Sequence, residues 1–351
     1  MMHDELSGLA RLLGSAGRGF LSLGDGPAAC NARLSSFGLA PTPEQRRAYR
    51  ELILSAPGLE RFVNGAILDD ETLHQRTRAG TRFADALRER GIVPGVRADA
   101  GSVALALAPR ETVAEGLDGL RGRLVECAAL GAGFAAWRAS FRIDEEGRPT
   151  DRAVAANAHA LARFAAAAQD CGLVPVLDVE MLSDGTHDVA RSADATSRVL
   201  RRTFGELTDA GVALDAVILQ TSMVAPGLDA RERLETAEVV AETLRVLGAT
   251  VPLAVAAIAF VSDADAGDAA LERLCAMNTT MPRRRPWPLT FVFGRSVQHA
   301  ALAAWRGMPE RAREAQRVVV ERAERSSLAA CGAFGGKRAG VPSLPAMMRV
   351  A

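Results

Sequence analysis

Lysine is almost missing from this chain of 351 residues: Lys337 is the only one, against 41 arginines. It stands in a C-terminal stretch without helix or strand pattern, so covalent catalysis by a lysine amine has no candidate in the expected core. The formal net charge is zero, which gives no electrostatic bias toward nucleic acid or an anionic membrane. The sequence has no run of about 18 apolar residues, so neither a membrane span nor a secretion signal is predicted, and we expect a cytoplasmic protein.

Cysteine is also scarce. The five cysteines are widely spaced and never in a C-x-x-C arrangement: Cys30, Cys127, Cys171, Cys275 and Cys331. This spacing argues against a disulfide framework and against a thiolate metal site. We expect buried, unreactive thiols.

The sequence does have a regular alternation of short apolar runs with longer amphipathic segments. Eight short runs predict strands: Gly19 to Leu23, Gly65 to Leu68, Val93 to Ala98, Phe134 to Phe141, Leu173 to Val179, Ala216 to Gln220, Leu253 to Val261 and Leu289 to Phe293. Eight strands, each followed by a helix, predict one (β/α)8 TIM barrel of class α/β over residues 1–331, with residues 332–351 as a flexible tail. A doubly wound open sheet is the alternative, but it gives no reason for eight strands, and the first run lacks a glycine-rich dinucleotide motif.

Two predicted helices have recognisable N-terminal residues. Thr42 is a cap, Pro43 follows at the first helical position, and Gln45 completes a capping box. Asp229 is expected to begin another helix, which runs toward Leu247.

In a barrel of this kind the active site lies at the C-terminal ends of the strands. The residues expected there form a polar ring on an apolar scaffold: Gly24, Asp25, Gly26, Arg97, Asp99, Ala136, Trp137, Arg138, Asp178, Glu180, Gln220, Ser262, Asp263, Gly294 and Arg295. Asp178 and Glu180 are two positions apart on one strand, so both side chains point to the same face.

Six segments carry a resemblance to a known family: Thr42 to Arg50, Gly65 to Gln75, Gly116 to Leu120, Phe134 to Arg138, Val174 to Asp188 and Pro286 to Arg295. These segments follow one another in the order found in the eukaryotic-type class I fructose-bisphosphate aldolases. The chain resembles that family from about residue 10 to residue 332. The resemblance implies a phosphorylated small-molecule substrate, a homo-oligomer of two or four subunits and no cofactor. Because no histidines cluster at the strand ends, a metal-dependent site is not expected; His187 is expected to make a structural hydrogen bond.

The resemblance also shows where this chain departs from the family. The family's Schiff-base lysine falls on Gln220, whose primary amide cannot form an imine, and a second family lysine falls on Ala136. The family's aspartate after the first strand falls on Gly24, although Asp25 follows at once. The acid–base glutamate of the fifth strand falls on Asp178, one methylene shorter, whereas its neighbouring glutamate is retained as Glu180.

Positions that hold two phosphates in the family are largely retained. They are Arg33, Arg97, Ser262 and Arg295, with Gly294 beside the last. Guanidinium groups bind phosphate oxygens in pairs, and the loops after the last two strands commonly bind phosphate. Asp263 and Ala264 replace family glycines beside Ser262, which weakens that subsite.

Two functions follow from these residues. In the first, the protein is a diverged enzyme that acts on an anionic carbonyl substrate by acid–base chemistry. Asp178 and Glu180 would transfer protons there, Gln220 and Arg138 would polarise oxygen, and the last two catalytic candidates are Asp25 and Asp99. In the second, the chain is a catalytically silent paralogue with a binding or regulatory role, and its carboxylates and arginines remain as an inherited ion-pair network.

Overall fold

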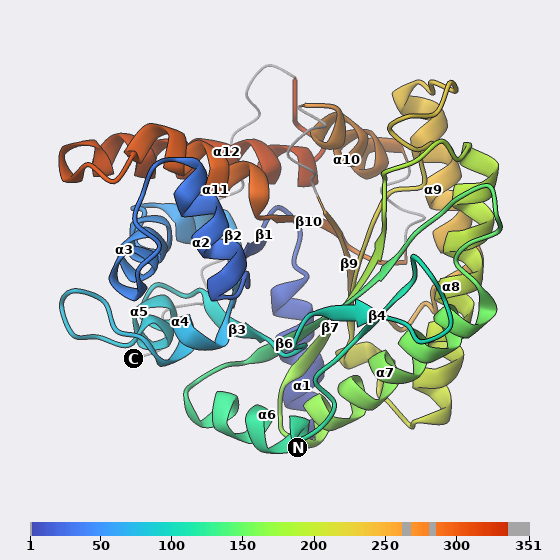
Figure 1. Ribbon diagram of the computed structural model, residues 1–351, viewed down its shortest axis with the longest axis horizontal. Helices are drawn as coiled ribbons and strands as arrows, with labels where there is room; N and C mark the ends of the chain where they lie inside the picture. The colour runs from blue at the N-terminus through green and yellow to red at the C-terminus, as the bar shows by residue number, and fades with distance from the viewer. Residues whose placement is uncertain (1, 262–267, 281–285, 336–351) are drawn as a thin grey trace.

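A computed structural model describes residues 2–261, 268–280 and 286–335. Eight parallel strands close into one barrel, in the spatial order β1-β10-β9-β8-β7-β6-β3-β2 (Figure 1). The strands are β1 Gly19–Leu23, β2 Val63–Leu68, β3 Val93–Arg97, β6 Phe134–Phe141, β7 Val174–Met181, β8 Ile218–Thr221, β9 Ala257–Val261 and β10 Leu289–Phe293. The predicted (β/α)8 barrel is therefore confirmed.

Helices follow the strands and surround them. They are α1 Met2–Leu13, α2 Pro27–Ser36, α3 Pro43–Leu54, α4 Asp70–His74, α5 Phe83–Glu89, α6 Leu120–Ala129, α7 Asp151–Asp170, α8 Val189–Asp209, α9 Thr236–Thr250, α10 Ala269–Thr280, α11 Arg295–Trp305 and α12 Ala312–Ala330. Within the described ranges, none of them is long and apolar enough to cross a membrane.

The predicted element boundaries are confirmed in some places and wrong in others. Thr42 caps α3 by accepting a hydrogen bond from the backbone of Gln45 at 3.1 Å. The strand expected from Leu253 begins at Ala257 instead. Asp229 begins no helix: it lies in a loop, where its backbone N–H donates to the Gly185 carbonyl at 3.0 Å. Helix α9 starts at Thr236 instead, where a capping box forms between the two glutamates at 235 and 238.

Helix α1 closes the N-terminal end of the barrel and was not predicted. Leu6, Ala10 and Leu13 are buried on one face of α1, and they pack against a barrel core that includes Phe20 and Phe134. The two phenylalanine rings meet edge to face, with centroids 5.6 Å apart. Burying each of these large side chains contributes about 1.5–3 kcal/mol, so this end of the barrel is a packed core and not an opening.

The opposite end carries an additional hairpin between β3 and β6. Its strands are β4 Ser102–Ala104 and β5 Thr112–Ala114, which pair antiparallel. The buried side chain of Asn157 fixes the hairpin to α7, because it accepts from the backbone N–H of Ala114 at 3.2 Å and donates to the carbonyl of Thr112 at 2.8 Å. The segment that leads into this hairpin, with Asp99 and Gly101, lies at the barrel mouth.

All five cysteines are free thiols, in agreement with the prediction that they form no disulfides. Cys30 and Cys127 are buried as expected, and burial raises the pKa of both thiols. The expectation of burial is wrong for Cys331, which is exposed just after α12. Lys337 and most of the predicted tail lie outside the described residues.

Candidate active site

Asp178 on β7 is buried beneath the side chains that line the barrel mouth and has no solvent exposure. The strand register places it between Arg138 on β6 and Gln220 on β8. Its Oδ2 accepts from Nε of Arg138 at 2.7 Å and from Nη1 of Arg97 at 3.2 Å. Its Oδ1 has no hydrogen-bond partner among the described residues. Oδ2 of this carboxylate thus contacts two cations, whereas Oδ1 has no donor among the described residues.

Gln220 lies beside Asp178 and is equally enclosed, with 1% of its surface exposed. Its side-chain Oε1 has no partner within the described part of the chain, and the residue lines the main cavity of the mouth. A buried amide oxygen without a donor costs about 1–3 kcal/mol. A buried acceptor without a donor at the end of a barrel strand is typical of a binding site in which the ligand supplies the missing hydrogen bond.

Glu180 is the more accessible of the two carboxylates predicted to transfer protons, with 16% of its side chain exposed against none for Asp178. It is two positions beyond Asp178 on β7, and its Oε2 accepts from the Ser140 hydroxyl at 2.7 Å. Arg138 Nε lies 3.8 Å from the same oxygen, and Arg295 Nη2 lies 4.0 Å from Oε1. The negative charge of Asp178 raises the pKa of Arg138 above its ordinary value, although burial opposes this, so Arg138 stays positively charged between the two carboxylates.

Asp99 contacts the backbone more than it contacts the cavity. Its Oδ2 accepts from the backbone N–H of Arg138 at 3.0 Å, and its Oδ1 accepts from that of Gly101 at 3.2 Å. Arg97 Nη1 is 3.4 Å from Oδ2. Asp99 therefore joins the end of β6 to the loop before the hairpin, which is a positioning role.

Asp25 and Arg33 form a second ion pair, with Nη2 of Arg33 2.7 Å from Oδ2 of Asp25. Burial acts to raise the pKa of Asp25, but Arg33 and a hydrogen bond from Gln298 outweigh it, so the pKa lies below its usual value. Gln298 on α11 also donates to the Ser22 carbonyl at 2.9 Å and accepts from the Tyr49 hydroxyl at 3.0 Å. Sequence reasoning missed Gln298, although its place one helical turn after Arg295 is a usable signal.

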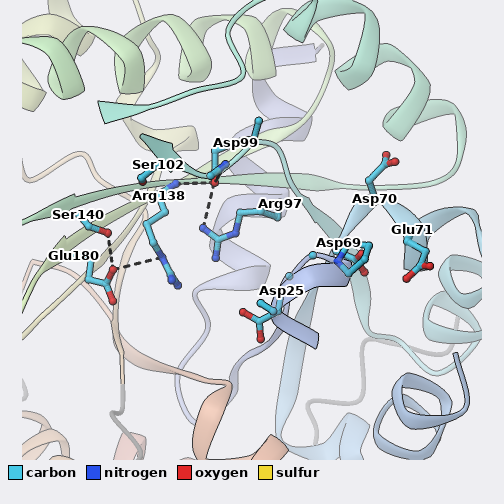
Figure 2. A pocket seen from close by; sticks show the side chains of 16 residues that line it. Asp25, Asp69, Asp70, Glu71, Arg97, Asp99, Ser102, Arg138, Ser140 and Glu180 are labelled. Carbon is cyan, nitrogen blue, oxygen red and sulfur yellow. Dashed lines mark hydrogen bonds and ion pairs between the residues drawn. The ribbon is translucent and has the colours of Figure 1, made fainter. Parts of the chain in front are cut away.

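The mouth contains two adjoining cavities. The larger, of about 740 Å³, is lined by Gln220, Gly294, Arg295 and Gln298 among others. The smaller, of about 620 Å³, lies on the side of β1, β2 and β3 (Figure 2). Both are lined by Asp25, Arg138 and Glu180, so these three predicted residues lie at one opening. Two other predicted residues, Asp178 and Arg33, line neither cavity. Ser262 and Asp263, predicted at the same opening, lie outside the described residues.

His187 lies at the edge of the larger cavity, 1% exposed. Its backbone carbonyl accepts from Gly227 at 2.9 Å, which joins the loop after β7 to the loop after β8. Burial lowers the pKa of His187, and its Nδ1 has no partner in the described ranges. The expected structural role therefore remains a prediction, supported by its position between two loops.

Comparison with known proteins identifies the family. A family model described as class-I fructose-bisphosphate aldolase matches residues 5–345. A probable fructose-bisphosphate aldolase class 1 from Xylella fastidiosa is 41% identical over 96% of this chain and 100% of its own length. A cytoplasmic fructose-bisphosphate aldolase isozyme from Cicer arietinum is 39% identical over 95% of this chain and 92% of its own.

A solved structure agrees with these sequence relatives. Fructose-bisphosphate aldolase from Plasmodium falciparum, crystallised with TRAP and a small-molecule inhibitor, superposes with a TM-score of 0.92. It is 35% identical in sequence, and the match covers 96% of each chain. The barrel, the order of its strands and the length of these matches agree, and the chain belongs to the class I fructose-bisphosphate aldolase family.

Proposed function

We propose that this aldolase-family protein acts on a phosphorylated sugar or another anionic carbonyl compound without forming a lysine imine. The observation that carries the proposal is Gln220, buried at the end of β8 beside Asp178. A primary amide cannot form an imine with a ketone. The only lysine of the sequence, Lys337, is far along the chain from every strand of the barrel.

Glu180 is the best candidate for proton transfer in the proposed reaction. It lines both cavities, and Ser140 orients it at 2.7 Å. Asp178 is fully buried and paired with Arg97 and Arg138, so its charge is already used to fix these guanidiniums. We infer that Glu180 moves the proton, while Arg138 and Gln220 bind the carbonyl or enolate oxygen. This set supports enolisation, retro-aldol cleavage, dehydration or condensation.

The predicted phosphate ligands support one phosphate better than two. Gly294 precedes the first turn of α11 and Arg295 begins it, so backbone N–H groups and a guanidinium converge beside the larger cavity. Arg33 and Arg97 are mostly buried against Asp25 and Asp178, with 17% and 11% of their side chains exposed. The Arg295 side chain is 61% exposed beside the larger cavity, although it also pairs with Glu180 at 4.0 Å. We therefore propose a monophosphorylated substrate whose phosphate lies at Gly294 and Arg295.

One observation favours the second candidate function, a catalytically silent paralogue. Arg97, Asp99, Arg138 and Asp178 contact one another in a network that forms without a substrate, although Asp178 Oδ1 has no partner among the described residues. A network of this kind stabilises the mouth whether or not chemistry takes place. In this alternative the protein binds a metabolite or a partner protein. A homo-oligomeric state and a cytoplasmic location remain predictions under both candidates.

Proton exchange separates the two candidates. The protein is incubated with dihydroxyacetone phosphate in D2O, and loss of the proton signal at the hydroxyl-bearing carbon is followed by NMR. The proposed enzyme exchanges this proton, whereas a silent paralogue binds the compound, as seen in a thermal shift, without exchange. If the compound is neither bound nor exchanged, the proposal of a phosphorylated substrate is wrong.

A further inference from the structure

The larger cavity of the mouth contains an arginine that the proposed reaction does not use. Arg273 lies on α10, three positions after Ala270, so the two residues share one face of the helix, and both line the cavity. The same cavity is lined by Val239 on α9 and by Gly294 and Arg295 at the start of α11. Its volume of about 740 Å³ is sufficient for a small organic molecule.

Arg273 is partly buried, and its guanidinium has no hydrogen bond or ion pair among the described residues. Its Nε is fully enclosed, whereas the two Nη atoms are not, so they remain accessible to a ligand in the cavity. Burial lowers the pKa of Arg273, and the opposing effect of Glu272, an exposed residue that does not line the cavity, is smaller. A cation that loses water without gaining an anion is unfavourable, and an anionic ligand would remove this deficit.

The other charged groups that line this cavity have partners. Its four carboxylates each contact a cation or a backbone donor: Asp25 with Arg33, Glu180 with Arg138 and Arg295, Asp184 with Arg142, and Glu232 with the backbone N–H of Val189. Arg138 and Arg295 lie within 4.0 Å of a carboxylate, and Arg233 donates to the backbone carbonyl of Glu232 at 2.9 Å. Within the part of the chain that the structure describes, Arg273 is thus the arginine of this cavity without a polar partner.

A single unpaired guanidinium matches a carboxylate better than a phosphate. Its planar fork donates two parallel hydrogen bonds to the two oxygens of a carboxylate, and one positive charge balances one negative charge. A phosphate monoester carries nearly two negative charges at neutral pH and has three acceptor oxygens, which one guanidinium does not balance. The first turn of α11 together with Arg295 is the better place for the phosphate.

We propose that Arg273 binds a carboxylate of the substrate whose phosphate lies at Gly294 and Arg295. Both groups of residues line one cavity, so a single molecule contacts both, and Glu180 lines that cavity as well. The inference rests on the proposed function for the phosphate end. It adds the chemical class of the substrate, which is a phosphorylated carbonyl compound that is also a carboxylic acid.

Three series of probes test this inference by calorimetric titration into the full chain at pH 7.5. They are straight-chain acids of three to six carbons with a phosphate on the last carbon, the matching primary amides, and the alkyl phosphates of the same lengths. Acid and amide differ only in one negative charge. At the chain length that fits, the acid should bind about tenfold or more tighter than its amide, and the amide about as tightly as the alkyl phosphate. If no acid binds tighter than its amide at any length, the proposal is wrong.

Variants locate the carboxylate. Arg273→Gln should reduce the preference for acid over amide to within about twofold and leave the affinity for the alkyl phosphate unchanged. Arg273→Lys keeps the charge without the planar fork and should retain part of the preference. Arg201→Gln, at an exposed position on α8, is the matched control and should leave the preference unchanged. A preference that persists in Arg273→Gln contradicts the assignment.

Thermal melting separates binding from a structural role. Because Arg273 is partly buried without a described counter-ion, Arg273→Gln should melt at the same temperature as the unaltered protein or higher. A marked fall in melting temperature would show that Arg273 stabilises the fold and would contradict the inference.

The phosphate end and the carboxylate end fail separately. If the alkyl phosphates bind and the acids show no preference, the phosphate site stands and the carboxylate site is wrong. If Arg273→Gln weakens the alkyl phosphates as much as the acids, Arg273 binds the phosphate and the carboxylate site is again wrong. If the acids show a preference that Arg273→Gln removes while no alkyl phosphate binds, the carboxylate site stands and the phosphate end is wrong. If no probe binds, both are wrong.

Discussion

The two sides of the barrel mouth use the same residue types in different ways. On the side of β7, β8 and α11, Glu180, Gln220 and Arg295 line a cavity, the Arg295 side chain is 61% exposed, and Gln220 Oε1 has no donor among the described residues. On the side of β1, β2 and β3, arginines and carboxylates are engaged with one another. An arginine at a barrel mouth is therefore better evidence for an anion site when its guanidinium is exposed to the cavity than when it is buried against a carboxylate. Substitutions on either side of the mouth test this difference, and Glu180 is expected to show the greatest change.

Glu180→Gln tests the side of β7, β8 and α11, which we call the open side. If Glu180 moves the proton, the rate of deuterium exchange into dihydroxyacetone phosphate should fall by about 10²–10⁴-fold while binding persists. NMR exchange rates and calorimetric affinities measure the two separately. Ser140→Ala, which removes only the hydroxyl that orients Glu180, should have a smaller effect. An exchange rate that does not change in Glu180→Gln would assign the proton transfer to another group.

Asp178→Asn tests the ion-pair network of Asp178 with Arg97 and Arg138. The substitution leaves Arg97 and Arg138 without the charge that both contact, and removing one member of a buried ion pair costs about 3–5 kcal/mol. The free energy of unfolding, from urea titration, should fall by about this amount. The exposed pair of Arg121 and Asp170 offers a control: Asp170→Asn should cost about 0–1 kcal/mol. Equal small losses in both would show that Asp178 is not central to the network.

Arg295→Ala tests the proposed phosphate end. Hydrogen bonds to a charged group contribute about 1.5–3 kcal/mol, so the affinity for dihydroxyacetone phosphate should drop by roughly 10–100-fold. Arg198→Ala, on the outer surface of α8, should bind as the unaltered protein does. If both variants bind with the same affinity, the phosphate lies elsewhere.

His187 gives the open side a pH dependence. Burial depresses the folded pKa of His187 below its unfolded value, so the unfolded state takes up a proton first as the pH falls. Its contribution to stability is complete above about pH 6.5 and is lost progressively below it. Urea titrations from pH 8 to pH 5 should show this loss, and His187→Gln should flatten the curve. The same slope in both proteins would exclude His187 as its cause.

Gln220→Lys is expected to change catalysis least. The amine would be restored in position, but Gly24 and Ala136 still lack the side chains found there in the family, so cleavage of fructose 1,6-bisphosphate should remain near background. A coupled assay for glyceraldehyde 3-phosphate measures this. Efficient cleavage by this single variant would contradict the idea of a rebuilt site.

Local sequence pattern predicted the barrel well and the contacts of its mouth less well. Phe134–Phe141 and Leu289–Phe293 are strands over the predicted ranges because each is a mostly apolar run between two helices. The same pattern predicted that Asp178, Glu180 and Gln220 lie at one opening; Glu180 and Gln220 line the larger cavity, whereas Asp178 is buried beside Gln220 and lines neither cavity. The lid formed by α1 was missed even though its apolar residues recur at helical spacing.

Partners distant in the sequence could not be predicted in this way. Arg33 and Arg97 were expected to bind phosphate, but their nearest carboxylates include Asp25 and Asp178, and the latter pairing joins residues 81 positions apart. The contribution of Gln298 likewise depends on contacts with Tyr49 and Ser22, which only the closed barrel brings together. Pairing of charges across strands is a property of the fold, and residue type alone does not fix it.

Trapping with borohydride tests the central claim most directly. The protein is mixed with dihydroxyacetone phosphate, reduced with sodium borohydride and examined by intact-mass spectrometry, beside a class I aldolase that retains its lysine. We predict an unchanged mass for this chain and a stable adduct on the control. A mass gain on this chain equal to that of the control adduct, at any residue, would contradict the account.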